Sequence, residues 1–421
     1  MKIPWVGRRR GRVRAGRGAA AVTAVVVVLL GSVAPGDAHA REGADDIQAP
    51  TTATPVGTFD GVDYVQYDGV FAGLTSTGAF RVPYRISAPV DPDDGNRAVV
   101  VEPPHFALGT GILDVQLGRE FLLGRRFAHA SVGYSTTSFG PGQDQRILDP
   151  SVPGTFIHGG VADGIGRTDD EILADFARAL ATDAEARAMV GKVRDTYLTG
   201  VSDSASAPLR LVTSGQAGGV FDLVLPVTVE SSGDPQVALG AGGFAGKLLI
   251  VNSAAEDSGN LVDSGAHPDQ YRFYAVAGTP HVSDPLVPFF SNHTTPASWI
   301  PAVRAHFLQA NRWVRNRVAP PPSRGIDDGP HLPFVALGEA VFHPGFLGSY
   351  DNVRTITELG FGTHRAYLQA FNAAVDTYVR SGAISRDEAR DMKLRASLCP
   401  PLTYTETYRD HYDRFVALTP C

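Results

Sequence analysis

A serine in a short polar turn is the first residue whose setting suggests chemistry. Residues 197–201 form an apolar segment that ends at Gly200 and Val201, and Ser202 follows directly. Residues 205–212 then have the pattern of a helix. A sharp strand-to-helix turn of this kind exposes a serine Oγ and points the helix N-terminus at the negative charge that forms when the hydroxyl attacks a carbonyl. Ser202 is therefore the predicted nucleophile.

A serine hydroxyl attacks efficiently when a histidine accepts its proton and a carboxylate orients that histidine. Both partners occur downstream, each in a loop that follows an apolar, strand-like segment. Glu256 and Asp257 follow residues 248–251, and His281 follows residues 271–276. We interpret His281 as the base and Glu256 as the acid, with the adjacent Asp257 as the alternative acid. The order serine, acid, histidine is typical of one large class of serine hydrolases.

The oxyanion that forms during attack needs backbone N–H donors. Asp203 supplies one because it follows the nucleophile, and the loop after residues 98–101 supplies a second at His105 or Phe106. Two other patterns are set aside. The sequence His158-Gly159-Gly160 does not follow the required strand and is interpreted as a loop, and Ser214 lacks the leading glycine of an elbow.

No cofactor or metal ion is expected. The phosphate-binding patterns G-x-G-x-x-G and Gly-Lys-Ser/Thr do not occur in the sequence, and no histidine pair has the spacing of a zinc site. The formal net charge is -7 even with the basic cluster of the N-terminus included. An acidic chain of this kind argues against nucleic acid as a partner.

The N-terminus predicts export. A cluster of arginines precedes an apolar run at residues 19–30, and the small-residue sequence Ala38-His39-Ala40 follows. This order is typical of a secretory signal peptide cleaved after Ala40. The apolar run is shorter than the roughly 20 residues of a spanning helix, so no stable membrane span is expected after cleavage. In an oxidising compartment the two cysteines of the chain, Cys399 and Cys421, are expected to form a disulfide.

Alternating strand and helix patterns predict an α/β protein with a mostly parallel, doubly wound sheet and helices on both faces. The strand-like and helix-like segments carry the predicted site, and residues 327–421, with two further helices, are expected to form an appendage that packs on the sheet domain and covers the pocket. The expected organisation is a signal peptide at 1–40, a flexible mature N-terminus at 41–55, a core at 56–326 and a helical C-terminal extension at 327–421. The expected strands are at residues 62–70, 79–86, 98–101, 127–133, 192–201, 220–229, 248–251 and 271–276, and the expected helices are at 117–123, 171–180, 205–212, 296–318, 364–380 and 385–395.

Several further motifs accompany the elbow at Ser202. They are residues 123–132, Leu209-Arg210, Phe221-Asp222, residues 271–281 and Gly382-Ala383-Ile384. Together these motifs resemble the α/β-hydrolase-domain family of often secreted proteins, whose elbow reads Gly-x-Ser-Gln-Ser. The resemblance covers most of the mature chain and implies an α/β-hydrolase fold with Ser202 as nucleophile and His281 as base. Glu256 falls where the family has its downstream carboxylate, and this chain departs from the family at Asp203, where the family usually has glutamine.

The expected function is that of a secreted serine hydrolase acting on a small-molecule or lipid-like carboxylic ester through an acyl-enzyme intermediate. Two alternatives stay open. One is a catalytically inactive member that uses the same pocket for binding, which the departure at Asp203 suggests. The other is a peptidase or polyester depolymerase that uses the same three residues.

Overall fold

The computed structural model describes residues 46–75, 78–105, 117, 119–134, 146–148, 156–158, 169–230, 233–256, 258–282, 295, 297–329 and 331–397. Several sequence-based expectations lie outside these residues: the signal peptide and its cleavage site, Phe106, Asp257, and the cysteine pair Cys399 and Cys421.

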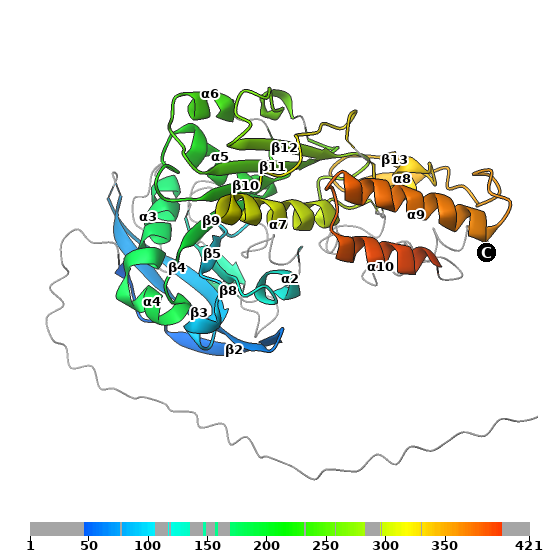
Figure 1. The fold of residues 1–421 in the computed structure, drawn as a ribbon. Coiled ribbons are helices and arrows are strands. Elements are labelled where there is room, and N and C mark those ends of the chain that lie inside the picture. Colours follow the sequence, from blue (N-terminus) through cyan, green and yellow to red (C-terminus); the bar gives the residue numbers. More distant parts are fainter. Residues whose placement is uncertain are drawn as a thin grey trace, which may run out of the picture. The chain divides into compact units, whose positions relative to one another are not determined.

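The described chain is built around a ten-stranded sheet, which Figure 1 shows as a ribbon. Its strand order is β1-β3-β4-β6-β5-β9-β10-β11-β12, and β2 pairs with β3. Neighbouring strands are parallel from β6 through β12 and antiparallel from β1 through β4. The strands are β1 (Asp46–Ile47), β2 (Thr52–Phe59), β3 (Val62–Thr75), β4 (Gly78–Pro89), β5 (Ala98–Val101), β6 (Ala128–Val132), β9 (Asp195–Val201), β10 (Leu223–Val227), β11 (Lys247–Ser253) and β12 (Tyr271–Val276). The predicted mostly parallel sheet is confirmed.

Alternating side chains along the central strands supply two large hydrophobic cores. In β5 every residue is buried: Val100 belongs to one core, and Val99 and Val101 belong to the other. Strand β11 divides in the same way, with Leu249 in the first core and Ile250 in the second. Strands of a parallel sheet carry apolar side chains on both faces, because helices cover both faces of the sheet.

Helices cover both faces of the sheet, and Figure 1 shows α5 and α6 on one side of β10–β12 and α7 on the other. The apolar residues of α3, among them Ile172 and Phe176, lie in the core that α5 also joins. On the opposite face, Val303 and Phe307 of α7 enter the other core. The helices are α2 (Arg119–Leu123), α3 (Asp169–Thr182), α4 (Ala184–Val190), α5 (Ser206–Thr213), α6 (Pro235–Gly240) and α7 (Ile300–Asn316), with short 3-10 turns η1 (Pro92–Asp94), η2 (Ser202–Ala205) and η3 (Gly259–Leu261).

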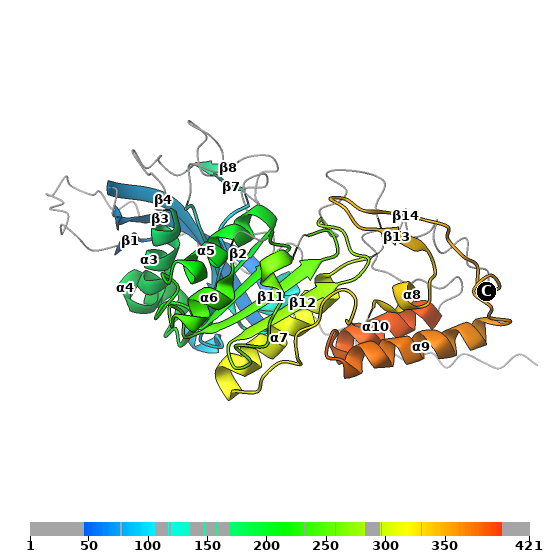
Figure 2. The same ribbon diagram turned by 90° about the horizontal axis from the view of Figure 1, so that it is seen from above.

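The C-terminal part contains α8 (Pro333–Ala336), α9 (His364–Arg380), α10 (Arg386–Ser397) and a hairpin of β13 (Val341–His343) and β14 (Ser349–Asp351). Figures 1 and 2 both show α9 and α10 side by side. Tyr367 and Phe371 of α9 are buried in the same core as α7, so the extension packs against the sheet domain. The β13–β14 hairpin is absent from the sequence-based expectation.

Part of the segment expected to be flexible, residues 41–55, pairs with the sheet. Residues 46–47 form β1, which pairs with β3, and β2 begins at Thr52 and also pairs with β3. Backbone pairing orders this stretch although its side chains are mostly exposed.

A second small sheet joins β7 (Arg146–Leu148) and β8 (Phe156–His158). Among the helices of the described ranges, none is both long enough and apolar enough to cross a membrane.

Candidate active site

The turn that carries Ser202 has the strained geometry expected of a nucleophile elbow. Strand β9 ends at Val201, η2 begins at Ser202, and α5 follows. Ser202 has φ 61, a left-handed conformation that is costly for a residue with a side chain. Hydrogen bonds from neighbouring residues stabilise this conformation. Ser202 N donates to Thr228 Oγ1 at 3.2 Å, and Ser204 Oγ bonds both the N and the O of Val201, at 3.1 and 2.9 Å.

Gly200 is required by the same turn. A Cβ at this position would lie 2.3 Å from the backbone oxygen of Ser204 and 2.9 Å from the backbone nitrogen of Ala205. The chain after Ser202 therefore folds back against Gly200 with no room for a methyl group. This close approach explains why a glycine stands two residues before the serine.

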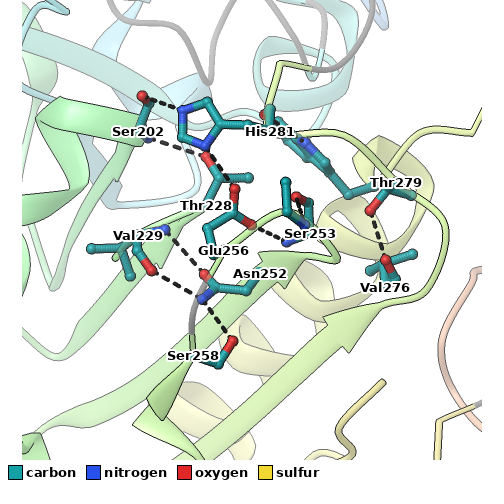
Figure 3. Close-up of polar contacts among 12 residues, drawn as sticks. Ser202, Thr228, Val229, Asn252, Ser253, Glu256, Ser258, Val276, Thr279 and His281 are labelled. Atoms are coloured by element: carbon teal, nitrogen blue, oxygen red, sulfur yellow. Dashed lines mark hydrogen bonds and ion pairs between the residues drawn. The ribbon is translucent and has the colours of Figure 1, made fainter. Parts of the chain in front are cut away.

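Ser202, His281 and Glu256 form a continuous chain of contacts (Figure 3). Ser202 Oγ lies 2.6 Å from His281 Nε2, and His281 Nδ1 lies 2.6 Å from Glu256 Oε1. Because a carboxylate only accepts hydrogen bonds, Nδ1 carries the proton that faces Glu256, which leaves Nε2 facing the serine hydroxyl. The structure thus brings together the three residues that the sequence singled out.

Glu256 is fixed and almost completely removed from water. Its side chain is 1% exposed, and its Oε2 accepts a hydrogen bond of 2.6 Å from Ser253 N, at the end of β11. The loops after β9, β11 and β12 supply Ser202, Glu256 and His281. In the sheet, β9, β10, β11 and β12 lie side by side and run parallel. The C-terminal ends of β9, β11 and β12 therefore lie at one edge of the sheet, where ligands bind in such folds.

The C-terminal extension holds His281 in place. His281 N donates to Gly345 O at 2.9 Å, and Val282 N donates to Phe346 O at 2.8 Å. The imidazole also stacks on the Phe346 ring, with ring centroids 5.2 Å apart and planes 19° apart. From the start of α7, Trp299 Nε1 donates to His281 O at 3.3 Å. The segment between β13 and β14 therefore belongs to the site. It lies in the extension that was expected to cover the pocket, although the sequence did not indicate its contacts with His281.

The two predicted oxyanion donors stand differently. Asp203 N lies in the first turn after Ser202, at the start of the helical segment that continues into α5. His105 follows β5 and is buried, while Phe106 lies outside the described residues. Burial, and to a lesser extent the nearby His281, lowers the pKa of His105 to about 4. His105 is thus neutral near pH 7 and adds no charge beside His281.

The strand end that precedes His105 is anchored by a buried pair. Glu102 is fully buried and accepts from His129 Nε2 at 3.0 Å, and Ser131 Oγ donates to Glu102 O at 2.7 Å. Both partners belong to β6, the parallel neighbour of β5. These bonds fix the position at which the chain leaves the sheet toward His105.

A cavity of about 360 Å³ opens beside Ser202 and His281. Its wall combines Ser202, Glu256 and His281 with other polar side chains and one aromatic ring, that of Phe346, which is 60% exposed. Sequence reasoning missed Thr228, Glu230 and Phe346, because they reach the pocket through pairing of distant segments. The lining residues are Ser202, Asp203, Ser206, Thr228, Glu230, Ala255, Glu256, His281 and Phe346.

The rival serine lies elsewhere. Ser214 is at the C-terminal end of α5, the opposite end from Ser202, and its Oγ bonds Leu211 O and Gln216 Oε1, at 3.4 and 3.2 Å. His158 pairs with Arg146 in the small β7–β8 sheet, and Gly159 is outside the described residues. In the described part of the chain, no group of three or more His, Cys, Asp or Glu residues is arranged to hold a metal ion.

Comparison with protein families identifies residues 74–331 as a match to the family described as alpha/beta hydrolase domain. The matched range is more than half of the chain and contains Ser202, Glu256 and His281. No curated protein sequence gives a significant match.

Similar solved structures include three of low sequence identity. The S-formylglutathione hydrolase from Agrobacterium tumefaciens is 10% identical with a TM-score of 0.38, over 65% of this chain and 100% of that chain. A fungal esterase from Rhizomucor miehei is 12% identical with a TM-score of 0.36, over 63% of this chain and 87% of that chain. Est1E from Butyrivibrio proteoclasticus is 11% identical with a TM-score of 0.31, over 62% and 98%.

Replacing Gly200 by alanine tests the strained turn. Because the new methyl group meets backbone atoms that cannot give way, we expect Gly200→Ala to lower the free energy of unfolding by about 2–4 kcal/mol. The matched control is Gly362→Ala, since a Cβ at Gly362 meets no atom within 4 Å. Denaturant unfolding of the two variants measures the difference. Equal stability of the two variants would contradict the close approach at Gly200.

Proposed function

The chain belongs to the alpha/beta hydrolase domain family, and from this premise we propose that it is a serine hydrolase that cleaves a carboxylic ester through an acyl-enzyme intermediate. The observation that carries the proposal is the continuous contact chain from Ser202 Oγ through His281 to Glu256. It is the arrangement that makes a serine hydroxyl nucleophilic.

In the first half of the reaction, Ser202 Oγ attacks the carbonyl carbon of the ester while its proton passes to His281 Nε2. The carbonyl π electrons move to oxygen and form a tetrahedral oxyanion. When that intermediate collapses, the bond to the alcohol oxygen breaks, and the alcohol leaves with the proton from Nε2. In the second half, water attacks the acyl carbon while one of its protons passes to Nε2. When this second tetrahedral intermediate collapses, the bond to Ser202 Oγ breaks, Nε2 returns the proton to Oγ, and the carboxylic acid is released.

Glu256 acts through His281. Its Oε1 accepts from Nδ1 at 2.6 Å and keeps Nε2 directed at the serine, and its negative charge stabilises the imidazolium that forms during attack. Ser253 N holds the other carboxylate oxygen at 2.6 Å, so the orientation is fixed before substrate arrives. The backbone N–H groups of Asp203 and of His105 or Phe106 form the proposed oxyanion hole.

The departure at Asp203 does not favour the binding-only alternative. Its side chain lines the pocket, and no hydrogen bond joins it to Ser202 or His281, whose separation remains 2.6 Å. A carboxylate in the first turn of a helix is electrostatically favourable. The arrangement thus supports a working nucleophile rather than one blocked by its neighbour.

We also propose that the mature enzyme is exported after cleavage at Ala40 and that Cys399 pairs with Cys421. The A-x-A pattern and the two cysteines motivate this. We expect the secreted protein to begin at Arg41 and to have the mass of the disulfide form, and reduction to destabilise it by about 2–4 kcal/mol. Intact-mass measurement with and without reductant and a thiol-alkylating reagent checks both points. Alkylation of the secreted protein without reductant would refute the pairing.

Variants of the three residues test the mechanism. We expect Ser202→Ala and His281→Ala each to lower kcat for an activated ester by about 10⁴-fold or more, and the double variant to be little worse, because neither residue works without the other. Glu256→Ala should cost less, about 10²- to 10⁴-fold, since a misoriented histidine still accepts protons. Steady-state kinetics of purified variants with retained thermal stability measure these effects.

Two further substitutions serve as controls. Ser214→Ala is expected to keep wild-type activity, because Ser214 lies at the far end of α5. Asp257→Ala is expected to be nearly silent. If Asp257→Ala lost more activity than Glu256→Ala, the acid would be the neighbouring residue, and if activity survived Ser202→Ala, the proposed mechanism would be wrong.

A further inference from the structure

The cavity beside Ser202 has an uneven distribution of charge. Three of its nine lining residues carry carboxylates, namely Asp203, Glu230 and Glu256, and none is a lysine or arginine. Glu256 is already engaged with His281 and is 1% exposed. Asp203 and Glu230 are exposed, so their carboxylates are open to whatever enters the pocket. Among the lining residues that the structure describes, the accessible charge is therefore that of Asp203 and Glu230.

Neither carboxylate is neutralised within the described part of the chain. Asp203 and Glu230 make no ion pair and no side-chain hydrogen bond there. The cation that acts on Asp203 is Arg210, but its guanidinium is held by Asp170 through two contacts of 3.1 and 2.8 Å. Although the Asp203 side chain reaches solvent, the protein atoms around its carboxylate remove part of the water that would hydrate the ionised form, and this raises the pKa of Asp203. A positive group bound nearby would compensate that loss.

The two carboxylates stand on fixed backbone. Asp203 follows Ser202 in the turn that Thr228 and Ser204 stabilise. Glu230 follows Val229, whose N and O both bond the side chain of Asn252, each at 3.0 Å (Figure 3). Asn252 Nδ2 also donates to Ser258 Oγ at 3.2 Å, which ties this segment to the loop that carries Glu256. The backbone positions of both carboxylates are therefore set relative to the nucleophile before a ligand arrives.

We propose that this pocket selects esters that carry a positively charged organic group, and that Asp203 and Glu230 are the residues that recognise it. The inference rests on the proposed function and names its substrate class. An organic cation fits better than a metal ion, because the described residues include no cluster of three metal-binding side chains. The exposed ring of Phe346 supplies an apolar surface for the alkyl groups around such a charge.

Electrostatics gives the direction and size of the effect. A cationic substrate gains attraction from two carboxylates in the pocket, while an anionic ester is repelled. Removing one carboxylate should therefore lower the preference for a cation by about fivefold to tenfold. The preference should also weaken as salt is added, because exposed charges are screened within about 10 Å at 0.1 M ionic strength.

The test uses pairs of esters that differ in charge and hardly in shape. One pair is the acetate ester of choline and its carbon isostere, in which tert-butyl replaces trimethylammonium. The second pair places the same two groups on the acyl side, as ethyl esters of trimethylammonio-butyrate and its tert-butyl isostere. For each pair, kcat/KM is measured with the wild type, Glu230→Gln, Asp203→Asn and the double variant, and each value is divided by the ester's rate of alkaline hydrolysis. Glu185→Gln, an exposed acid on α4 that does not line the pocket, is the matched control.

We expect the wild type to favour the cationic member of at least one pair. The ratio for that pair should fall about fivefold to tenfold in Glu230→Gln and again in the double variant, and it should be unchanged in Glu185→Gln. A wild-type ratio near one in both pairs, or a ratio that Glu230→Gln and Asp203→Asn leave unaltered, would overturn the charge preference while the proposed esterase function stands. If no ester of either charge is hydrolysed, the proposed function and this inference fall together.

Discussion

The hydrogen bond between Ser202 Oγ and His281 Nε2 depends on backbone that is forced into an unusual shape. Ser202 adopts φ 61, and a serine does so only where its surroundings compensate the strain. Gly200 leaves room for the turn, Ser204 bonds the backbone of Val201, and Thr228 bonds the backbone of Ser202. The sheet positions the other two residues. Strands β11 and β12 run parallel to β9, so the loops that follow them place Glu256 and His281 at the edge of the sheet where Ser202 lies.

The site also depends on a part of the chain that comes after Ser202, Glu256 and His281. The carbonyls of Gly345 and Phe346 accept from the backbone of His281 and Val282, and the Phe346 ring stacks on the imidazole. Helix α9 places Tyr367 and Phe371 in the core shared with α7, which connects this extension to the sheet domain. An expected boundary at residue 326 would therefore separate His281 from the groups that position it.

The sequence was sufficient where local pattern and backbone geometry coincide. Strand β12 and helix α9 have the predicted bounds. Each has a regular pattern of apolar residues, and residues typical of turns mark its ends. Ser202, Glu256 and His281 could be proposed because each follows a buried strand. The pairing of β1 and β2 with β3 could not, because it comes from backbone bonds to a distant strand. Phe346 and Glu230 were missed for the same reason: only the folded chain brings them to Ser202.

Covalent labelling tests the central claim most directly. Ser202 is the residue that a fluorophosphonate should modify, because the reagent reacts with a serine hydroxyl activated by a histidine. Peptide mapping of the labelled wild-type protein is expected to find one adduct, on the peptide that contains Ser202, and the adduct should be lost in folded His281→Ala. An unlabelled folded wild-type protein, or an adduct at Ser214 in place of Ser202, would contradict the account.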